Sequence, residues 1–244
     1  MIRLLAPALL LAGPALATGD NVSGEFCPQV LLVQSRDCTA TLIRHCDGAP
    51  SGAHTFLTYD AEGLISSGVA DAQGAWLESF FNLENIHERA TGTPADPVSL
   101  DALLESGVDT FDFMISHTEF GGPARNLRVI GADMLTGDSV TIDGVPLQVV
   151  ATDLRILEAD GTTYYQTRGQ QYVSPEMRLW FLGTDSVVGD DGSVTNYDAT
   201  PAAFLFPGDP GFDDETPLYG CAAGAEDGVK TAPLPAGPGK NTNK

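Results

Sequence analysis

Turn signals divide this sequence into short segments. Between runs of alternating apolar and polar residues stand six pairs of a polar residue and glycine: Asp47-Gly48, Glu62-Gly63, Gln73-Gly74, Asp143-Gly144, Asp160-Gly161 and Asp191-Gly192. Such pairs favour the tight turns of β-hairpins, because glycine adopts positive φ angles at little steric cost. The pattern predicts a mainly β fold in which successive strands pair as antiparallel hairpins.

The clearest example is a predicted meander of three strands at Ser139–Ile142, Pro146–Glu158 and Thr162–Val173. On the middle strand, Val150, Leu154 and Ile156 share one parity. Asp153 and Arg155 share the other. Because successive side chains of a strand point to opposite faces, one face of this sheet is apolar and needs a covering layer.

Eight further strands are predicted at Gln29–Ser35, Cys38–Cys46, His54–Tyr59, Leu64–Val69, Ala75–Leu83, Thr110–His117, Leu127–Ala132 and Met177–Leu182. The segment 86–97 is interpreted as loop. One short helix is predicted, with Ser99 or Asp96-Pro97 as its cap, Gly107 at its end, and an apolar stripe of Leu100, Leu103 and Leu104. The expected architecture is an antiparallel meander or half-barrel sheet with this one helix as its cover.

The N-terminus has the three parts of a secretory signal peptide. Arg3 precedes the uncharged apolar run Leu4–Gly13, and Ala15–Ala17 forms an A-x-A cleavage site. The run is well short of the roughly 20 residues that cross a bilayer, so no transmembrane segment is expected. We predict a signal peptide at 1–17, an N-terminal extension at 18–26, a single β-rich domain at 27–221 and a disordered Pro/Gly/Lys tail at 222–244. The predicted location is the periplasm or the medium.

The chain is strongly acidic. It has 12 Lys and Arg against 33 Asp and Glu, a net charge of −21; loss of Arg3 with the leader leaves 11 basic residues and a net charge of −22. Binding to nucleic acid or to anionic lipid relies on clustered basic residues. The composition therefore excludes nucleic acid as a partner.

The four cysteines form an even set in a chain with an export signal, which predicts two disulfides. Cys38 and Cys46 would stand at opposite ends of one strand, roughly 26 Å apart at strand rise, which is too far for a bond. Cys27 then pairs with Cys46 or with Cys38. A hairpin that turns at Arg36-Asp37 would bring Cys27 opposite Cys46, which favours this pair and leaves Cys38 for Cys221.

Two segments of the second half resemble a known family. A predicted strand ends in Thr163-Tyr164-Tyr165, and the next segment reads Gln171-Tyr172-Val173-Ser174-Pro175-Glu176-Met177-Arg178-Leu179. This order is similar to that of the half-barrel carrier and lipoprotein-localisation proteins of bacterial periplasms, in which an aromatic-rich strand precedes a turn resembling Val-Asp-Pro-Glu-Thr-Gly-Leu-Pro. The final Gly-Leu-Pro is missing here. The remaining sequence resembles secreted proteins of alphaproteobacteria.

Motifs for catalysis are sparse. The sequence contains no G-x-S-x-G and no S-x-x-K, and the His87-Glu88 pair lacks a second histidine four residues after the first. His54 and His117 fall on predicted strands, where a structural role is the simpler interpretation. No cofactor is expected. A weak calcium site is considered at Asp185, Asp190, Asp191 and Asp198, with a solvated acidic loop as the alternative.

Aromatic residues supply the remaining candidates. Five of them on predicted strands are expected either to pack in the core or to line an apolar cleft in the concave face: Trp76, Phe113, Tyr164, Tyr165 and Trp180.

Three functions follow from these observations. The favoured hypothesis is a non-catalytic periplasmic binding or envelope-associated protein whose concave face holds an apolar small molecule or an envelope protein. One alternative is an envelope hydrolase that uses His54 or His117 with a carboxylate. The other is a structural or interaction protein whose concave face is fully packed.

Overall fold

The structure, a computed structural model, describes residues 27–45, 52–119, 122–189 and 192–221. The predicted signal peptide, extension and tail lie outside these ranges. The first half of the chain forms β1 (Gln29–Ser35), β2 (Ala40–His45), β3 (His54–Asp60), β4 (Gly63–Ala70), β5 (Trp76–Phe81), β6 (Ile86–Asp96) and α1 (Leu100–Ser106). The second half forms β7 (Val108–Glu119), β8 (Arg125–Ile142), β9 (Val145–Leu157), β10 (Thr163–Ser174), β11 (Leu179–Val188), β12 (Val194–Asp198) and β13 (Pro201–Leu205).

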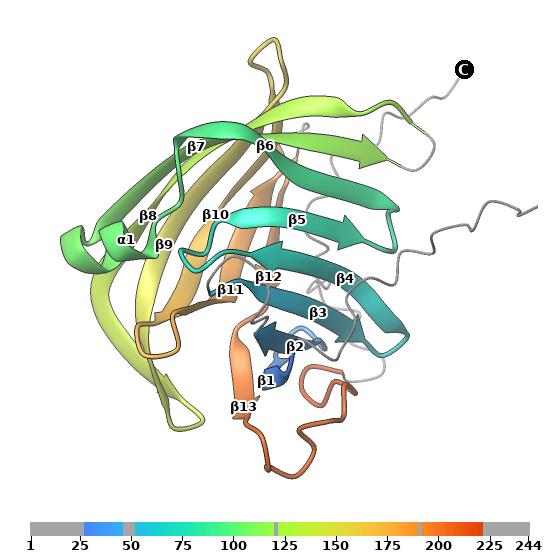
Figure 1. The fold of residues 1–244 in the computed structure, drawn as a ribbon, viewed down its shortest axis with the longest axis vertical. Coiled ribbons are helices and arrows are strands. Elements are labelled where there is room, and N and C mark those ends of the chain that lie inside the picture. Colours follow the sequence, from blue (N-terminus) through green and yellow to red (C-terminus); the bar gives the residue numbers. More distant parts are fainter. Residues whose placement is uncertain (1–26, 46–51, 120–121, 190–191, 222–244) are drawn as a thin grey trace, which may run out of the picture.

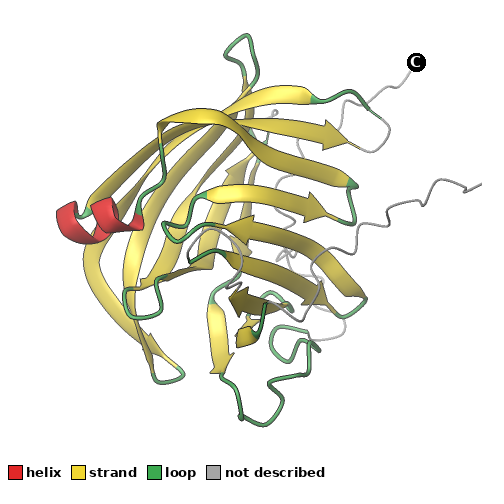
Figure 2. Ribbon diagram, viewed as in Figure 1, coloured by secondary structure: helices red, strands yellow, loops and turns green. Residues whose placement is uncertain are grey.

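All strands belong to one antiparallel sheet. Strands β1 to β12 pair in the order in which they occur in the chain, and β13 adds to the free side of β1, so β12 and β13 are the two edges. Figures 1 and 2 show a strongly curved sheet with the single helix near one end of β7 to β9. The predicted fold class, a mainly β meander with one short helix, is confirmed.

Local sequence explains several elements. The predicted turn between β8 and β9 forms at Asp143 and Gly144, whose φ angles of 47° and 81° are the positive values that a type I′ hairpin turn requires. At α1, the Ser99 side chain accepts a hydrogen bond from the Ala102 N–H at 3.1 Å, and Gly107 ends the helix at φ 82°. The buried face of α1 presents Leu100 and Leu103 to Val150 and Val173 on β9 and β10.

Four strands differ from the prediction: β6, β8, β12 and β13. β8 is one continuous strand where two were predicted, at 127–132 and 139–142, and β12 falls on a segment for which no strand was predicted. The segment interpreted as loop at 86–97 is the strand β6, and the prediction was wrong because its inward side carries Glu88, a buried charge that interrupts the apolar alternation. The strand β13 was not predicted either. Its five residues, rich in Ala and Pro, are held by pairing with β1, which lies far away in sequence.

The curvature of the sheet brings its two edges together. Between β12 and β13, the Ala199 N–H donates to the Gly183 carbonyl of β11, and the next residue, Thr200, accepts from the Arg36 N–H in the β1–β2 turn. The chain therefore passes directly from one edge of the sheet to the other. As a result, the sheet curves around an interior that one of its sides faces.

The C-terminal cover, residues 206–221, lies on the opposite side of β1 to β3. Phe212 packs on an apolar cluster formed by Leu32, Ala40, Leu42, Leu57, Tyr59 and Leu205. The Cys38–Cys221 disulfide fixes the end of the cover, which confirms this predicted pair. The other predicted pair includes Cys46, which lies outside the described residues.

Candidate functional site: a cavity on the inner face of the sheet

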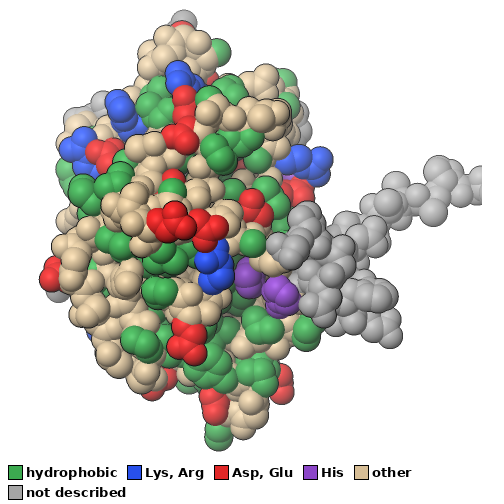
Figure 3. All heavy atoms as spheres, turned by 60° about the vertical axis from the view of Figure 1, so that its left-hand side comes forward, with side chains coloured by type: hydrophobic (Ala, Val, Ile, Leu, Met, Phe, Trp, Pro, Cys, Tyr) green, Lys and Arg blue, Asp and Glu red, His purple; other side chains and the backbone are tan. Residues whose placement is uncertain are grey.

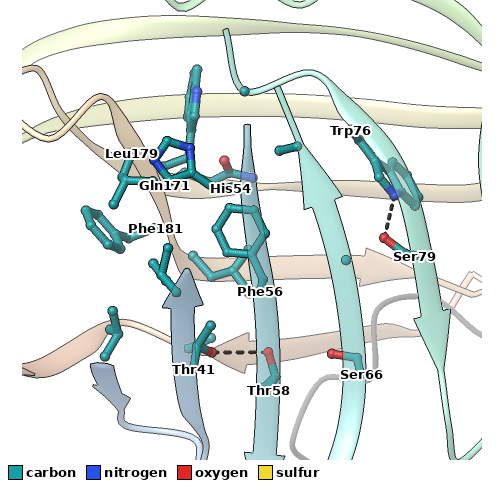
Figure 4. Close-up of a pocket in the computed structure, with 18 of the residues that line it drawn as sticks. Thr41, His54, Phe56, Thr58, Ser66, Trp76, Ser79, Gln171, Leu179 and Phe181 are labelled. Carbon is teal, nitrogen blue, oxygen red and sulfur yellow. Dashed lines mark hydrogen bonds between the residues drawn. The ribbon is translucent and has the colours of Figure 1, made fainter. Parts of the chain in front are cut away.

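A cavity of about 880 Å³ occupies the interior side of the sheet. Side chains from β1 to β5 form one wall, and side chains from β7 to β11 form the other. Figure 4 shows Phe56 and Phe181 pointing toward this space from two strands, with His54 and Gln171 nearby. The strands that line it are distant in sequence, so the cavity depends on the curvature of the complete sheet.

Most of the lining is apolar. Its largest side chains are aromatic: Phe56, Trp76, Phe81, Phe111, Phe113 and Trp180. The glycine at 74 lies against the Trp180 indole, because a Cβ built there would come within 2.3 Å of Nε1. The buried Trp180 N–H has no hydrogen-bond partner among the described residues. Binding sites for small molecules are usually apolar spaces with a few polar groups of this kind.

Several polar side chains of the wall already satisfy one another. The hydroxyls of Thr41 and Thr58 lie 3.2 Å apart on β2 and β3, and the Trp76 indole N–H donates to the Ser79 hydroxyl at 2.5 Å (Figure 4). These pairs satisfy four polar groups of this wall, and the second pair fixes the orientation of Trp76 on β5.

One buried carboxylate stands apart from these pairs. Asp133 on β8 lines the cavity with only 6% of its surface exposed, and its Oδ1 accepts a hydrogen bond from the Thr152 hydroxyl at 2.6 Å. Asp109 faces it directly from β7 and is also buried. Burial, with a further contribution from the charge of Asp109, raises the pKa of Asp133 to about 6.

His54 lines the same cavity at the start of β3. Burial and the nearby His45 lower the pKa of His54, so the ring is neutral at neutral pH. Among the described residues, no carboxylate or hydroxyl lies within hydrogen-bond distance of the His54 ring. In the described part of the lining, His54 is thus not paired with a carboxylate.

His117, the other histidine considered, has a carboxylate partner but lies away from the cavity. Its Nδ1 is 2.7 Å from Glu88 Oε1, and both side chains are almost fully buried between β6 and β7. The Tyr164 hydroxyl lies 3.4 Å from His117 Nε2, and Arg125 stacks over the Tyr164 ring. We interpret this group as a structural network, because none of its members lines the cavity.

The five aromatic candidates divide into two sets. Trp76, Phe113 and Trp180 line the cavity. Tyr164 and Tyr165 do not line it. They pack against the core cluster around Ile115 and Ile156, to which Phe113 also belongs, and Tyr164 is part of the His117 network. Burial raises the pKa of Tyr165, with Asp185 adding to the effect.

The structure does not show the four calcium candidates as one site. Asp185 lies on β11, and Asp198 ends β12, where its side chain accepts the Thr200 N–H. Asp190 and Asp191 lie outside the described residues. In the part of the chain that the structure describes, no group of three or more His, Cys, Asp or Glu side chains could hold a metal ion.

Sequence reasoning missed Asp133 and Phe56 as cavity residues. Asp109 shares the parity of Phe111 and Phe113 on β7, so its inward position could have been recognised. Asp133 lay just beyond a predicted strand that ended at residue 132, whereas β8 continues to Ile142. In both strands, an acidic residue continues the alternating positions of the buried apolar residues, and this pattern could have predicted an acid on the inner face.

Comparisons with protein-family models, with curated proteins and with solved structures found no match. No helix in the described ranges is long and apolar enough to cross a membrane. The function is therefore argued from the cavity itself.

Proposed function

We propose that this chain is a non-catalytic binding protein that holds an apolar small molecule in its internal cavity. The observation that carries the proposal is the cavity, whose volume of about 880 Å³ lies within the range of small-molecule sites. A purely structural protein would gain stability by filling such a space with side chains, since protein interiors are normally close-packed.

The export that the sequence predicts would suit this role. The signal-peptide pattern at 1–17 and the Cys38–Cys221 disulfide both favour an oxidising compartment, and we place the protein in the periplasm or the medium. The resemblance of 163–165 and 171–179 to half-barrel carriers points to the same kind of protein. Transfer of an apolar molecule from water into an apolar cavity is favourable, which is what a carrier in an aqueous compartment uses.

Intrinsic fluorescence offers a direct test. The chain has two tryptophans, Trp76 and Trp180, and both line the cavity. We expect the uncharged dye N-phenyl-1-naphthylamine to bind with one-to-one stoichiometry, to quench tryptophan emission by energy transfer, and to be displaced by 1-decanol. Absence of saturable quenching and of saturable dye emission would remove the proposal.

A matched pair of variants locates the binding. Ser66 lines the cavity on β4, whereas Ser139 is exposed on β8. Ser66→Phe fills part of the space and should weaken dye binding at least about tenfold, a change of roughly 1.4 kcal/mol. Ser139→Phe adds the same ring outside and should leave the affinity unchanged. Equal effects of both variants would place the dye elsewhere.

A further inference from the structure

The acidic groups of the cavity differ in what they bond to. Five acids line it: Asp37, Asp60, Asp71, Glu84 and Asp133. Asp60 and Asp71 each accept two backbone N–H groups of their own turns, at 2.7 to 3.0 Å. Asp37 accepts the Thr39 hydroxyl within the β1–β2 turn. These three carboxylates stabilise turns at the ends of strands, and Glu84 lies in the turn between β5 and β6.

Asp133 has no such role. It lies within β8 rather than in a turn, and Thr152 is the one described hydrogen-bond partner of its side chain, which leaves Oδ2 without one. Across β7, Asp109 uses its carboxylate to accept the Ser99 N–H that precedes α1. No Arg, Lys or His of the described residues pairs with either acid. Two like charges that face each other across strands destabilise a sheet.

The cavity holds little positive charge to balance these acids. Arg178 is the cation in its lining, and its guanidinium is already bound to Asp101 at 2.9 Å. His54 is neutral, because burial lowers its pKa. An anionic head group would therefore meet unpaired carboxylates and no free cation among the lining residues.

Aromatic surface lies beside Asp133. Gly131 precedes Asp133 by two residues on the same face of β8, and a Cβ at this glycine would come within 2.4 Å of the Phe111 ring. Phe111 therefore covers β8 next to the carboxylate, and Trp76 lines the same space. A carboxylate beside aromatic rings is the environment that attracts alkylammonium groups, through charge and through cation–π contact.

From this geometry we infer that the ligand of the cavity is an apolar molecule that carries an ammonium group, and that the ammonium binds Asp133 while the apolar part contacts the aromatic wall. The inference rests on the proposed binding function and names its ligand class. A bound cation would relieve the repulsion between Asp109 and Asp133, and it would supply the partner that Oδ2 lacks.

Three probes with the same chain length test the head group: decylammonium, decyl sulfate and 1-decanol. Titrations would follow tryptophan fluorescence and heat at low micromolar protein and about 0.15 M salt, which screens the acidic exterior. The exterior needs this control, because acidic side chains outnumber basic ones on the face that Figure 3 shows. We expect the ammonium probe to bind at least about tenfold more tightly than the sulfate, as a charge-assisted contact implies.

Matched variants assign the preference to Asp133. Asp133→Asn should reduce the preference for the ammonium probe to within about threefold, the loss of most of a charge-assisted contact. Asp138→Asn removes the same charge from an exposed position on β8 and should leave the preference intact. If Asp133→Asn does not fold, Asp133→Ser, which keeps a hydroxyl for Thr152, replaces it.

The outcomes separate the two proposals. Saturable binding of 1-decanol without preference for the ammonium probe, or an equal effect of both Asn variants, would overturn the inference and leave the binding function standing. Failure of all three probes to bind saturably would overturn both. Tighter binding of the sulfate would also contradict the inference, because it would require a free cation in the cavity.

Discussion

The two sides of the β1–β3 part of the sheet are completed in different ways. On the outer side, the C-terminal cover buries Leu42 and its neighbours, and the amide of Gln34 bonds to the cover through both Nε2 and Oε1. On the inner side, Phe56 and Thr58 of the adjacent strand border the cavity. The same strands thus have one close-packed side and one open side, and the proposed ligand would bind on the side that contributes less to packing.

Removal of the disulfide should lower the free energy of unfolding more than any other change considered, because it releases the cover from the outer face. The Cys38–Cys221 bond joins residues 183 apart in sequence, so Cys38→Ser/Cys221→Ser should lower the free energy of unfolding by about 4 kcal/mol. Urea unfolding measures this change, and hydrogen exchange should show that β1 and β2 open first. Dye binding should persist in the folded fraction. A loss below about 1 kcal/mol would show that the cover does not depend on its covalent link.

Matched leucine truncations compare the two faces directly. Leu42 is fully buried under the C-terminal cover, whereas Leu154 is half-buried and already borders the cavity. Leu42→Ala should cost about 3 kcal/mol of unfolding free energy. Leu154→Ala should cost about 1 kcal/mol, because fewer contacts are lost beside an existing space. Equal costs, measured by urea unfolding, would mean that the inner face is packed as closely as the outer.

The buried carboxylate of Asp133 on the inner face should make the free energy of unfolding depend on pH. Because its pKa rises to about 6 in the folded protein, the folded state holds a proton that the unfolded chain releases above about pH 4. Stability should therefore fall as the pH rises from about 4 to 6, and the loss persists at pH 7. Asp133→Asn removes this cost, so it should be more stable than the wild type by about 2 kcal/mol at pH 7 and equal to it near pH 4.

Asp138→Asn serves as the control for this measurement, because Asp138 is exposed. Its stability should follow that of the wild type across the same pH range. An Asp133→Asn variant that is less stable than the wild type at pH 7 would show that the carboxylate stabilises the fold, contrary to the expected cost of its burial.

Much of the fold could be predicted because its strands pair with their neighbours in sequence. The alternation on β9, the turn at Asp143-Gly144 and the caps of α1 are local signals. β6 was missed because Glu88 occupies an inward position that only a distant partner, His117, makes possible. β13 depends on pairing with β1, which no local pattern reveals.

The cavity itself could not be predicted from local patterns. Whether Trp76 and Phe113 leave space between them depends on the curvature of all thirteen strands and on the summed volume of the side chains inside. The sequence correctly placed the five aromatic candidates on strands. It could not show that Trp180 lines the cavity whereas Tyr164 contacts His117.

A crystal structure determined under xenon pressure tests the central claim most directly, since xenon enters apolar cavities that are free of side chains. We expect xenon sites between the strands that carry Phe56, Phe113 and Phe181, with little movement of the surrounding backbone. An interior filled by side chains, with no xenon bound, would contradict the proposal that the sheet encloses a ligand site.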